Sequence, residues 1–465
     1  MNALMNALLP CGPYILSFAI GYLLICLLDD KNEMSPLVCF FLAGGLGLAL
    51  SSQIIFYQLL IFDHLNKISI VIAHVALLAF LIRQFHQSGH NPLLRLKNIQ
   101  PKEFLLIAIL LLSLIPLGAY ARFFPLGGWD AWSVWNFKAK FILLGGPSWK
   151  NVFLPSLWQS SPHYPLLLPL VNVWGWLSLK HPDPAVPLVT AVMFTFLTAG
   201  LLFAILKDLT RTSWSIVPAI FLTTLPFFVK LATSQYCDIV FAYYLLATLY
   251  CILCAQKKKK NNLALLGGLF LGFLGFSKSE GTVAALIIIF LSVPYFLWAD
   301  KNQKKMNQRQ LAYLLLAATV SLLATVLFGI FYSPGNQTFI NGLVSAEHPS
   351  NLYRLKFILI FLLVELKSGK WNGIWILIGA GILLSGGLSF KRRLRIIPLF
   401  LFAYLFVIGF YYFLNTYFEI VWWLQYTLNR ILFSLLPTFV FWSFYSLWQK
   451  ERKSDPAGSQ RGPSG

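Results

Sequence analysis

One carboxylate stands among three tryptophans in the segment GGWDAWSVWNFK, at residues 127–138, which follows a long apolar stretch. The acid is Asp130, and its aromatic neighbours are Trp129, Trp132 and Trp135. A carboxylate within hydrogen-bond reach of a hydroxyl group can accept its proton, and aromatic rings offer flat apolar faces to a ligand. The chain has only 16 acidic residues. An acid at the predicted boundary between membrane and water therefore marks a candidate site for chemistry on a membrane-embedded substrate.

The composition identifies a polytopic membrane protein. Hydrophobic residues make up 58% of the chain and charged residues 11%, with a mean hydropathy of +0.71, whereas soluble domains carry about 25% charged residues. The net charge is +20, but nucleic-acid binding needs a basic face on a water-soluble surface. We therefore expect no nucleic-acid partner and interpret the charge as a signal of membrane topology.

Apolar segments of about 20 residues, the length that crosses a bilayer core, recur along the chain. They predict an all-α polytopic membrane protein with about thirteen transmembrane helices, at residues 11–28, 36–62, 68–85, 103–121, 184–206, 213–229, 239–256, 262–276, 282–298, 311–332, 371–390, 396–414 and 429–448. Lys and Arg gather in the short loops on one side, which is typical of the cytoplasmic side. This places the N-terminus outside and the C-terminus in the cytoplasm.

The pattern divides the chain into three regions. They are additional N-terminal transmembrane helices at 1–102, the main transmembrane domain at 103–450, and a polar tail, predicted to be disordered, at 451–465. Two shorter apolar segments, 165–179 and 355–366, would put basic clusters on the wrong side if they crossed the membrane. We expect them to form helices that lie at the outer interface or re-enter the membrane, inside two large outer loops at 122–183 and 333–370.

The predicted topology places most of the unusual polar residues on the outer face. They are Asp130, Lys138, His163, Tyr164, Asp238, Lys278, Glu280, Glu347, His348 and Arg430. Each has an ordinary explanation when taken alone, since tryptophans and acids are common at membrane boundaries and cations there bind lipid headgroups. Those explanations do not account for acids and cations on one face, so we interpret them as one site in contact with membrane lipid.

Five motifs follow one another along residues 104–448. They are W-D-A-W-x-x-W-x-x-K, H-Y-P-L-L-L-P, Y-x-D-I, S-K-x-E-G and N-R-I-L-x-x-L-L-P. Their order resembles the GT-C superfamily of integral membrane glycosyltransferases, above all bacterial members related to protein O-mannosyltransferases and to the aminoarabinose transferase of lipid A. The resemblance implies a GT-C-like fold in the bacterial inner membrane and makes residues 103–450 the catalytic domain.

The resemblance also implies transfer of a sugar from a polyprenyl-phosphate donor to a protein, lipid or glycan acceptor on the extracytoplasmic face. The family's candidate base, an acid in the first outer loop, matches Asp130, and a second acid in the next outer loop matches Asp238. The basic residue before the final L-L-P matches Arg430, which would hold the donor phosphate. Some members bind a divalent metal ion through an acid and a histidine in outer loops, and Glu347-His348 is similar to such a pair. The chain lacks the doubled acid that is usual beside the position of Asp130.

The residue chemistry fits this interpretation. A lipid phosphate is a good leaving group, so the protein mainly has to stabilise negative charge, a task suited to Arg430, Lys278 and Lys138. The three tryptophans would offer apolar faces to the sugar or to the prenyl chain, and His163, Tyr164 and Glu280 complete the predicted substrate-binding set. We expect a one-step inverting displacement at the anomeric carbon. Since G-x-G-x-x-G and P-loop motifs are lacking, the metal ion is the only cofactor considered.

Two alternatives remain open. A transporter or flippase of lipid-linked saccharides would show charges buried in mid-helix and an internal repeat with interrupted helices, and neither is evident in the sequence. An O-antigen ligase or polymerase would use the same donor chemistry with a different acceptor.

Overall fold

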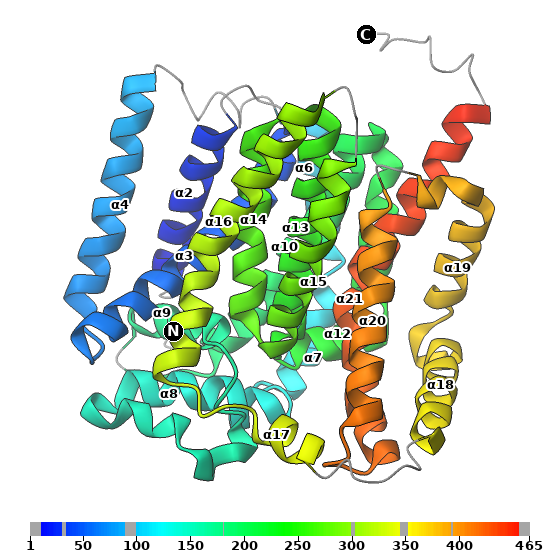
Figure 1. Ribbon diagram of the computed structural model, residues 1–465. Helices are drawn as coiled ribbons and strands as arrows, with labels where there is room; N and C mark the ends of the chain where they lie inside the picture. The colour runs from blue at the N-terminus through cyan, green and yellow to red at the C-terminus, as the bar shows by residue number, and fades with distance from the viewer. Residues whose placement is uncertain are drawn as a thin grey trace.

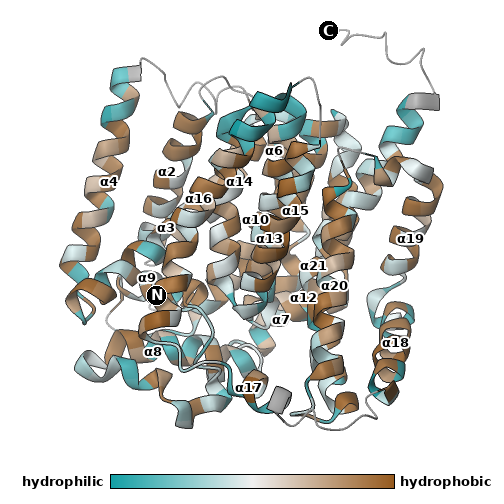
Figure 2. Ribbon diagram, viewed as in Figure 1, coloured by the Kyte–Doolittle hydropathy of each residue, from teal (hydrophilic) through white to brown (hydrophobic). Residues whose placement is uncertain are grey.

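The computed structural model describes residues 11–29, 34–88, 99–179, 181–298, 303–344, 352–391 and 394–454. These residues form a helical bundle and contain no β-strand (Figure 1). Within these ranges, ten helices are long and apolar enough to cross a membrane, or up to eleven if a bent pair is counted as one span. Hydrophobic residues follow the length of the helices, and hydrophilic residues gather mainly at their upper ends (Figure 2). The prediction of an all-α polytopic membrane protein is therefore confirmed.

The ten spans include one that is built from two consecutive helices, α6 (Pro101–Leu112) and α7 (Ile115–Phe123). The other nine are α2 (Cys11–Leu28), α3 (Pro36–Phe62), α4 (Lys67–Ser88), α10 (Ala185–Thr210), α13 (Cys237–Lys258), α15 (Ser279–Leu297), α16 (Lys304–Phe331), α20 (Ile396–Leu414) and α21 (Ile420–Ser454). The apolar window of α13 is 100% buried, against 22% for that of α4. Helix α13 therefore forms the centre of the bundle, while α4 lies at its edge (Figure 1).

The predicted count of thirteen spans is not confirmed. Two predicted spans, 262–276 and 371–390, correspond to α14 (Asn261–Ser277) and α19 (Ile374–Ser385), which are shorter than any of the ten spans. A third, 213–229, is divided between α11 (Val217–Thr224) and α12 (Pro226–Thr233), which meet at a bend of 68°. The bend has a local cause, because a proline disfavours helical backbone in the residue before it, and Leu225 is extended.

The short helix α14 is nevertheless packed deep in the bundle. A Cβ atom at Gly268 would contact the backbone of Leu314 in α16, and one at Gly272 would contact Ser321 of the same helix. Small residues of this kind let two membrane helices approach closely. The Ser321 hydroxyl also donates a hydrogen bond to the Gly268 carbonyl oxygen, at 3.2 Å.

Short helices and loops cover the lower end of the bundle in Figure 1, which we call the capped end. They include the π-helix η1 (Ala131–Trp135), α8 (Asn136–Leu144), the 3-10 helices η2 (Gly146–Phe153) and η3 (Pro155–Ser160), and α17 (Gln337–Val344). Helix α9 (Leu167–Trp176) packs on α8, and α18 (Leu352–Lys367) stands beside α20 and α21. The predicted outer segments 165–179 and 355–366 correspond to α9 and α18. Every residue of α9 is buried, so this helix packs inside the protein.

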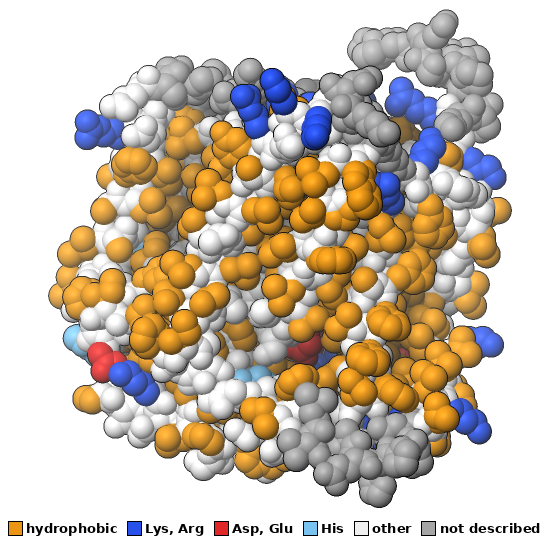
Figure 3. All heavy atoms as spheres, viewed as in Figure 1, with side chains coloured by type: hydrophobic (Ala, Val, Ile, Leu, Met, Phe, Trp, Pro, Cys, Tyr) orange, Lys and Arg blue, Asp and Glu red, His pale blue; other side chains and the backbone are white. Residues whose placement is uncertain are grey.

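Lys and Arg side chains gather along the opposite end, above a broad hydrophobic band (Figure 3). This is the distribution of charge from which the cytoplasmic side is predicted. Helix α21 reaches that end and continues to Ser454, which extends it into the predicted tail. The remaining residues of the tail lie outside the described ranges.

Candidate active site

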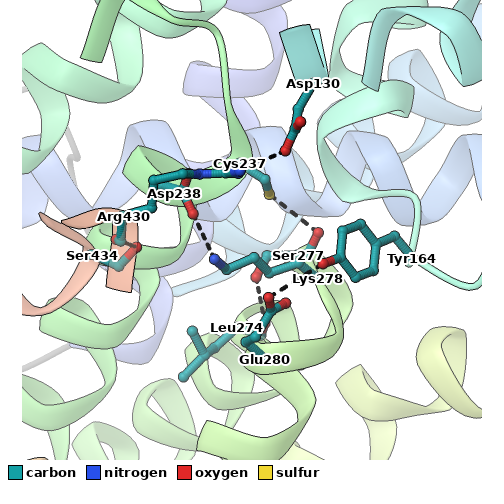
Figure 4. Close-up of polar contacts among 10 residues, drawn as sticks. All are labelled: Asp130, Tyr164, Cys237, Asp238, Leu274, Ser277, Lys278, Glu280, Arg430 and Ser434. Carbon is teal, nitrogen blue, oxygen red and sulfur yellow. Dashed lines mark hydrogen bonds and ion pairs between the residues drawn. The ribbon is translucent and has the colours of Figure 1, made fainter. Parts of the chain in front are cut away.

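Four charged side chains from distant parts of the chain meet at the capped end, and we call them the charged tetrad (Figure 4). They are Asp130, Asp238, Lys278 and Arg430. The Arg430 guanidinium donates from Nη1 to Asp130 Oδ2 at 2.7 Å and from Nε to Asp238 Oδ2 at 2.8 Å. Lys278 Nζ donates to the other oxygen of Asp238, at 2.6 Å. Acid and base thus alternate along the tetrad in the order Asp130, Arg430, Asp238, Lys278.

Local structure explains how three of these side chains reach one point. Asp238 lies in the first turn of α13, where a carboxylate is favoured by the helix dipole. Lys278 occupies the break between α14 and α15, with an extended backbone at φ −161° and ψ 168°. Arg430 lies in α21, which begins at Ile420, nine residues before the start of the predicted span 429–448.

The loop that carries Asp130 is fixed by two glycines. Gly127 has φ +71°, a backbone conformation that glycine adopts without strain. The Gly128 amide donates to the Ser234 carbonyl at 3.0 Å, and a Cβ atom at Gly128 would contact the Tyr236 ring and hydroxyl. The two glycines therefore let the Asp130 loop lie directly on the segment before α13.

The three tryptophans of this loop have different environments. Trp135 is fully buried and stacks on the Tyr164 ring, with centroids 5.3 Å apart. Trp129 and Trp132 are 62% and 48% exposed, and their rings meet edge to face at 4.3 Å. Residues 131–135 form a π-helix, a local irregularity that is frequent at functional sites.

The tetrad has a buried half and an open half. The side chains of Asp238 and Lys278 are 3% and 7% exposed, whereas those of Asp130 and Arg430 are 24% and 22% exposed. Burial lowers the pKa of the Lys278 ammonium, but Asp238 and Glu280 outweigh burial and the net pKa shift is upward. Lys278 is therefore cationic, and only the open half of the tetrad is accessible from outside.

Tyr164 and Glu280 lie beside the tetrad (Figure 4). The Tyr164 hydroxyl donates to Glu280 Oε1 at 3.3 Å. Burial, followed by the charge of Glu280, raises the pKa of Tyr164 well above its ordinary value. The phenol therefore keeps its proton and remains a donor. Oε2 of Glu280 is buried and has no hydrogen-bond partner among the described residues.

Lys138 is fully buried and contacts the backbone beside the tetrad, not the tetrad itself. Its Nζ donates to the backbone carbonyls of Ser161, at 2.6 Å, and of Tyr164, at 3.5 Å, and lies 5.6 Å from the Trp135 ring centroid. Burial lowers its pKa to about 7. The His163 ring packs against Tyr164, and burial together with Lys138 lowers its pKa to about 3, so this histidine is neutral at physiological pH.

The predicted metal pair, Glu347 and His348, lies outside the described residues. Within the described residues, no group of three or more His, Cys, Asp and Glu side chains could hold a metal ion. The metal ion therefore stays a prediction.

Tyr236 is a site residue that is missing from the predicted set. The Arg430 guanidinium carbon lies 4.3 Å from the centroid of its ring, close enough for a cation–π interaction. The signal was present in the sequence, because Tyr236 is the first residue of the Y-x-D-I motif. Other missed residues form a chain of amides under the same loop, in which Asn172 donates to Asn136 and Asn136 donates to Gln235.

Residues 173–328 match the protein family described as dolichyl-phosphate-mannose-protein mannosyltransferase, a family of the GT-C superfamily. These residues are therefore similar to part of a GT-C glycosyltransferase. No curated protein and no solved structure matches the chain. The resemblance seen in the motifs is therefore confirmed, and its apolar helices make the chain a multi-pass membrane protein.

The matched residues 173–328 contain Asp238, Lys278 and Glu280, whereas Asp130 and Arg430 lie outside them. The ion pairs join these two residues to Asp238 in the matched part. The tetrad thus links the matched residues to residues of the first and last predicted outer loops.

Proposed function

We propose that the protein transfers a sugar from a polyprenyl-phosphate donor to a hydroxyl group of a protein, lipid or glycan acceptor, by a one-step inverting displacement. In this proposal the capped end is the extracytoplasmic side, and the membrane is the bacterial inner membrane. The observation that carries the proposal is the charged tetrad, whose open half offers an acid and a guanidinium side by side.

The open half has both a hydrogen-bond donor and an acceptor that no described residue uses. Arg430 uses Nε and Nη1 in its ion pairs, and its Nη2 donates to none of the described residues. Asp130 accepts through Oδ2, and no described residue donates to its Oδ1. A guanidinium is well suited to binding a phosphate oxygen. The arrangement could therefore bind a lipid phosphate and an acceptor hydroxyl next to each other.

The proposed step breaks the bond between the anomeric carbon and the phosphate oxygen. The electron pair of that bond goes to the leaving phosphate, whose charge Arg430 stabilises. The acceptor oxygen bonds to the anomeric carbon on the opposite face, and its proton passes to Asp130. Asp238, whose other oxygen is bonded to Lys278, holds Arg430 in place, and no part of the step uses a metal ion.

The test is sugar transfer by purified protein in liposomes that contain polyprenyl-phosphate mannose. We expect Asp130→Asn to reduce the rate by roughly 100- to 10,000-fold, the usual contribution of a general base. The matched control is Asp63→Asn, because Asp63 forms an exposed ion pair with Lys150 away from the tetrad. Arg430→Lys keeps the positive charge but loses the two-pronged geometry, and we expect it to lower the rate as well.

Wild-type rates in both Asp130→Asn and Arg430→Lys would overturn the assignment. Movement of a labelled lipid-linked sugar across the liposome without a new glycosidic bond would instead favour the flippase. Transfer of a preassembled saccharide chain in place of a single sugar would indicate the ligase or polymerase.

A further inference from the structure

The feature that the proposed reaction leaves unexplained is the carboxylate of Glu280. Its Oε1 accepts a hydrogen bond from Tyr164, and its Oε2 is buried without a partner among the described residues. Nearly all buried polar groups in native proteins are hydrogen-bonded. An unpaired carboxylate oxygen beside a candidate active site therefore indicates a partner outside the described residues.

The neighbouring cations cannot supply that partner without breaking the tetrad. Lys278 Nζ is bonded to Asp238, at 2.6 Å, although Lys278 is only two residues away from Glu280 in the chain. Arg430 directs Nε and Nη1 to Asp238 and Asp130. Lys138 donates to backbone carbonyls instead. The missing donor to Glu280 must come from outside the described residues.

The turn before α15 fixes the position of this carboxylate. The amides of Gly281 and Thr282 both donate to the Lys278 carbonyl, at 2.8 and 3.1 Å. A Cβ atom at Gly281 would contact the Leu274 carbonyl oxygen, so the turn requires glycine there. Glu280 is therefore held at a set position relative to Lys278, as a recognition group must be.

A second unpaired polar atom belongs to Trp135, which contacts the same tyrosine. The indole Nε1 of Trp135 is buried and has no partner among the described residues, and the Trp135 ring stacks on Tyr164 at an interplanar angle of 9°. One unpaired atom is thus an acceptor and the other a donor, with Tyr164 in contact with both residues. Sugar hydroxyl groups both donate and accept hydrogen bonds, so a sugar could bond to both atoms.

We propose that Glu280 Oε2 accepts a hydrogen bond from one ring hydroxyl of the donor sugar, so that Glu280 forms the subsite that selects the sugar while Tyr164 binds its other oxygen. The inference rests on the proposed function, which supplies a lipid-linked sugar at this position. The ligand class is a neutral hexose that carries a free hydroxyl at the position facing Glu280. A site built to bond a hydroxyl strongly rejects an analogue that lacks it, because the buried acceptor is then left unpaired.

The test is a cycle between substrate and enzyme variants, with full-length protein in liposomes. The probes are polyprenyl-phosphate mannose and its 2-, 3-, 4- and 6-deoxy analogues, and kcat/KM for transfer is measured for the wild type and for Glu280→Ala. We expect one analogue to lose roughly 10- to 100-fold in the wild type, as for a hydrogen bond to a charged group. In Glu280→Ala that same analogue should be used as well as the parent donor.

The matched control is Tyr164→Phe, which removes the donor to Oε1 and leaves Oε2 in place. It should keep the discrimination against the same deoxy analogue, even where its overall rate falls. Equal penalties for every analogue in the wild type and in Glu280→Ala would overturn the subsite while leaving the proposed function standing. Absence of transfer by the wild type with the parent donor and all four analogues would overturn the proposed function, and the subsite with it.

Discussion

Asp238 is the residue whose loss should disturb the site most. Both of its carboxylate oxygens are bonded to cations, at 2.6 Å to Lys278 and at 2.8 Å to Arg430, and its side chain is 3% exposed. Asp238→Asn keeps the shape of the side chain but removes the charge that balances the two cations. Removing one partner of a buried ion pair typically costs about 3–5 kcal/mol. We expect a loss of that size in the free energy of unfolding.

The structure also predicts how this cost is divided. Arg430 keeps its second acid, Asp130, in the Asp238→Asn variant, whereas Lys278 loses its direct ion-pair partner while 7% exposed. Most of the cost should therefore come from Lys278. Replacing Lys278 by methionine in the same background removes the unbalanced ammonium, so the double variant should lose less stability than the two single variants added together, by about 2 kcal/mol.

The measurement is equilibrium unfolding of the purified protein in mixed micelles, for the wild type, both single variants and the double variant. Asp63→Asn is the control, because its ion pair with Lys150 is 62% and 44% exposed and such surface pairs contribute about 0–1 kcal/mol. If the effects of Asp238→Asn and Lys278→Met add within about 0.5 kcal/mol, as for independent sites, the coupling inferred from the tetrad is refuted.

Two further predictions concern the stability of the fold. The pKa of Lys138 is lowered to about 7 in the folded protein, whereas it is about 10.4 in the unfolded chain. Between these two pH values the unfolded chain binds more protons than the folded protein. The free energy of unfolding therefore rises with pH across that window. Lys138→Met should flatten this rise, which unfolding midpoints between pH 6 and 10 would show, and an unchanged slope would contradict the shift. A Cβ atom at Gly47 would contact the Ser17 carbonyl of α2, so Gly47→Ala should cost about 1–3 kcal/mol in the same unfolding assay. Gly379→Ala, with no atom within 4 Å of the added Cβ, should cost nothing, and equal effects of the two would show that this packing contact is unimportant.

The membrane class could be predicted from composition, because a bilayer demands long apolar helices whatever their packing. The number of spans could not be counted in the same way. Helix α14 has 17 residues and depends on close contact with α16 through Gly268 and Gly272, and hydropathy does not reveal helix contacts. The bend at Leu225 comes from Pro226. This proline lies inside the predicted span 213–229, and the prediction took no account of it.

The members of the site could be predicted from the sequence better than their pairings. The order of the motifs and their predicted place on the outer face selected all four residues of the tetrad. Asp130 and Arg430 are nevertheless 300 positions apart, so no local pattern indicates that they touch. Lys138 and Lys278 are indistinguishable as lysines in outer loops. Packing alone directs one to backbone carbonyls and the other to Asp238.

Asp130 and Asp238, the two acids predicted to be catalytic, occupy different environments in the tetrad. Charges in a low-dielectric interior are costly unless they are paired. Lys278 and Arg430 therefore need a negative charge beside them when no anionic substrate is bound. Asp238 provides it from the buried half, with both oxygens committed to cations. Asp130 lies in the open half with one oxygen uncommitted among the described residues. Only Asp130 is therefore free to take a proton from an acceptor, and Asp238 is better suited to keeping Lys278 and Arg430 together when no phosphate is bound.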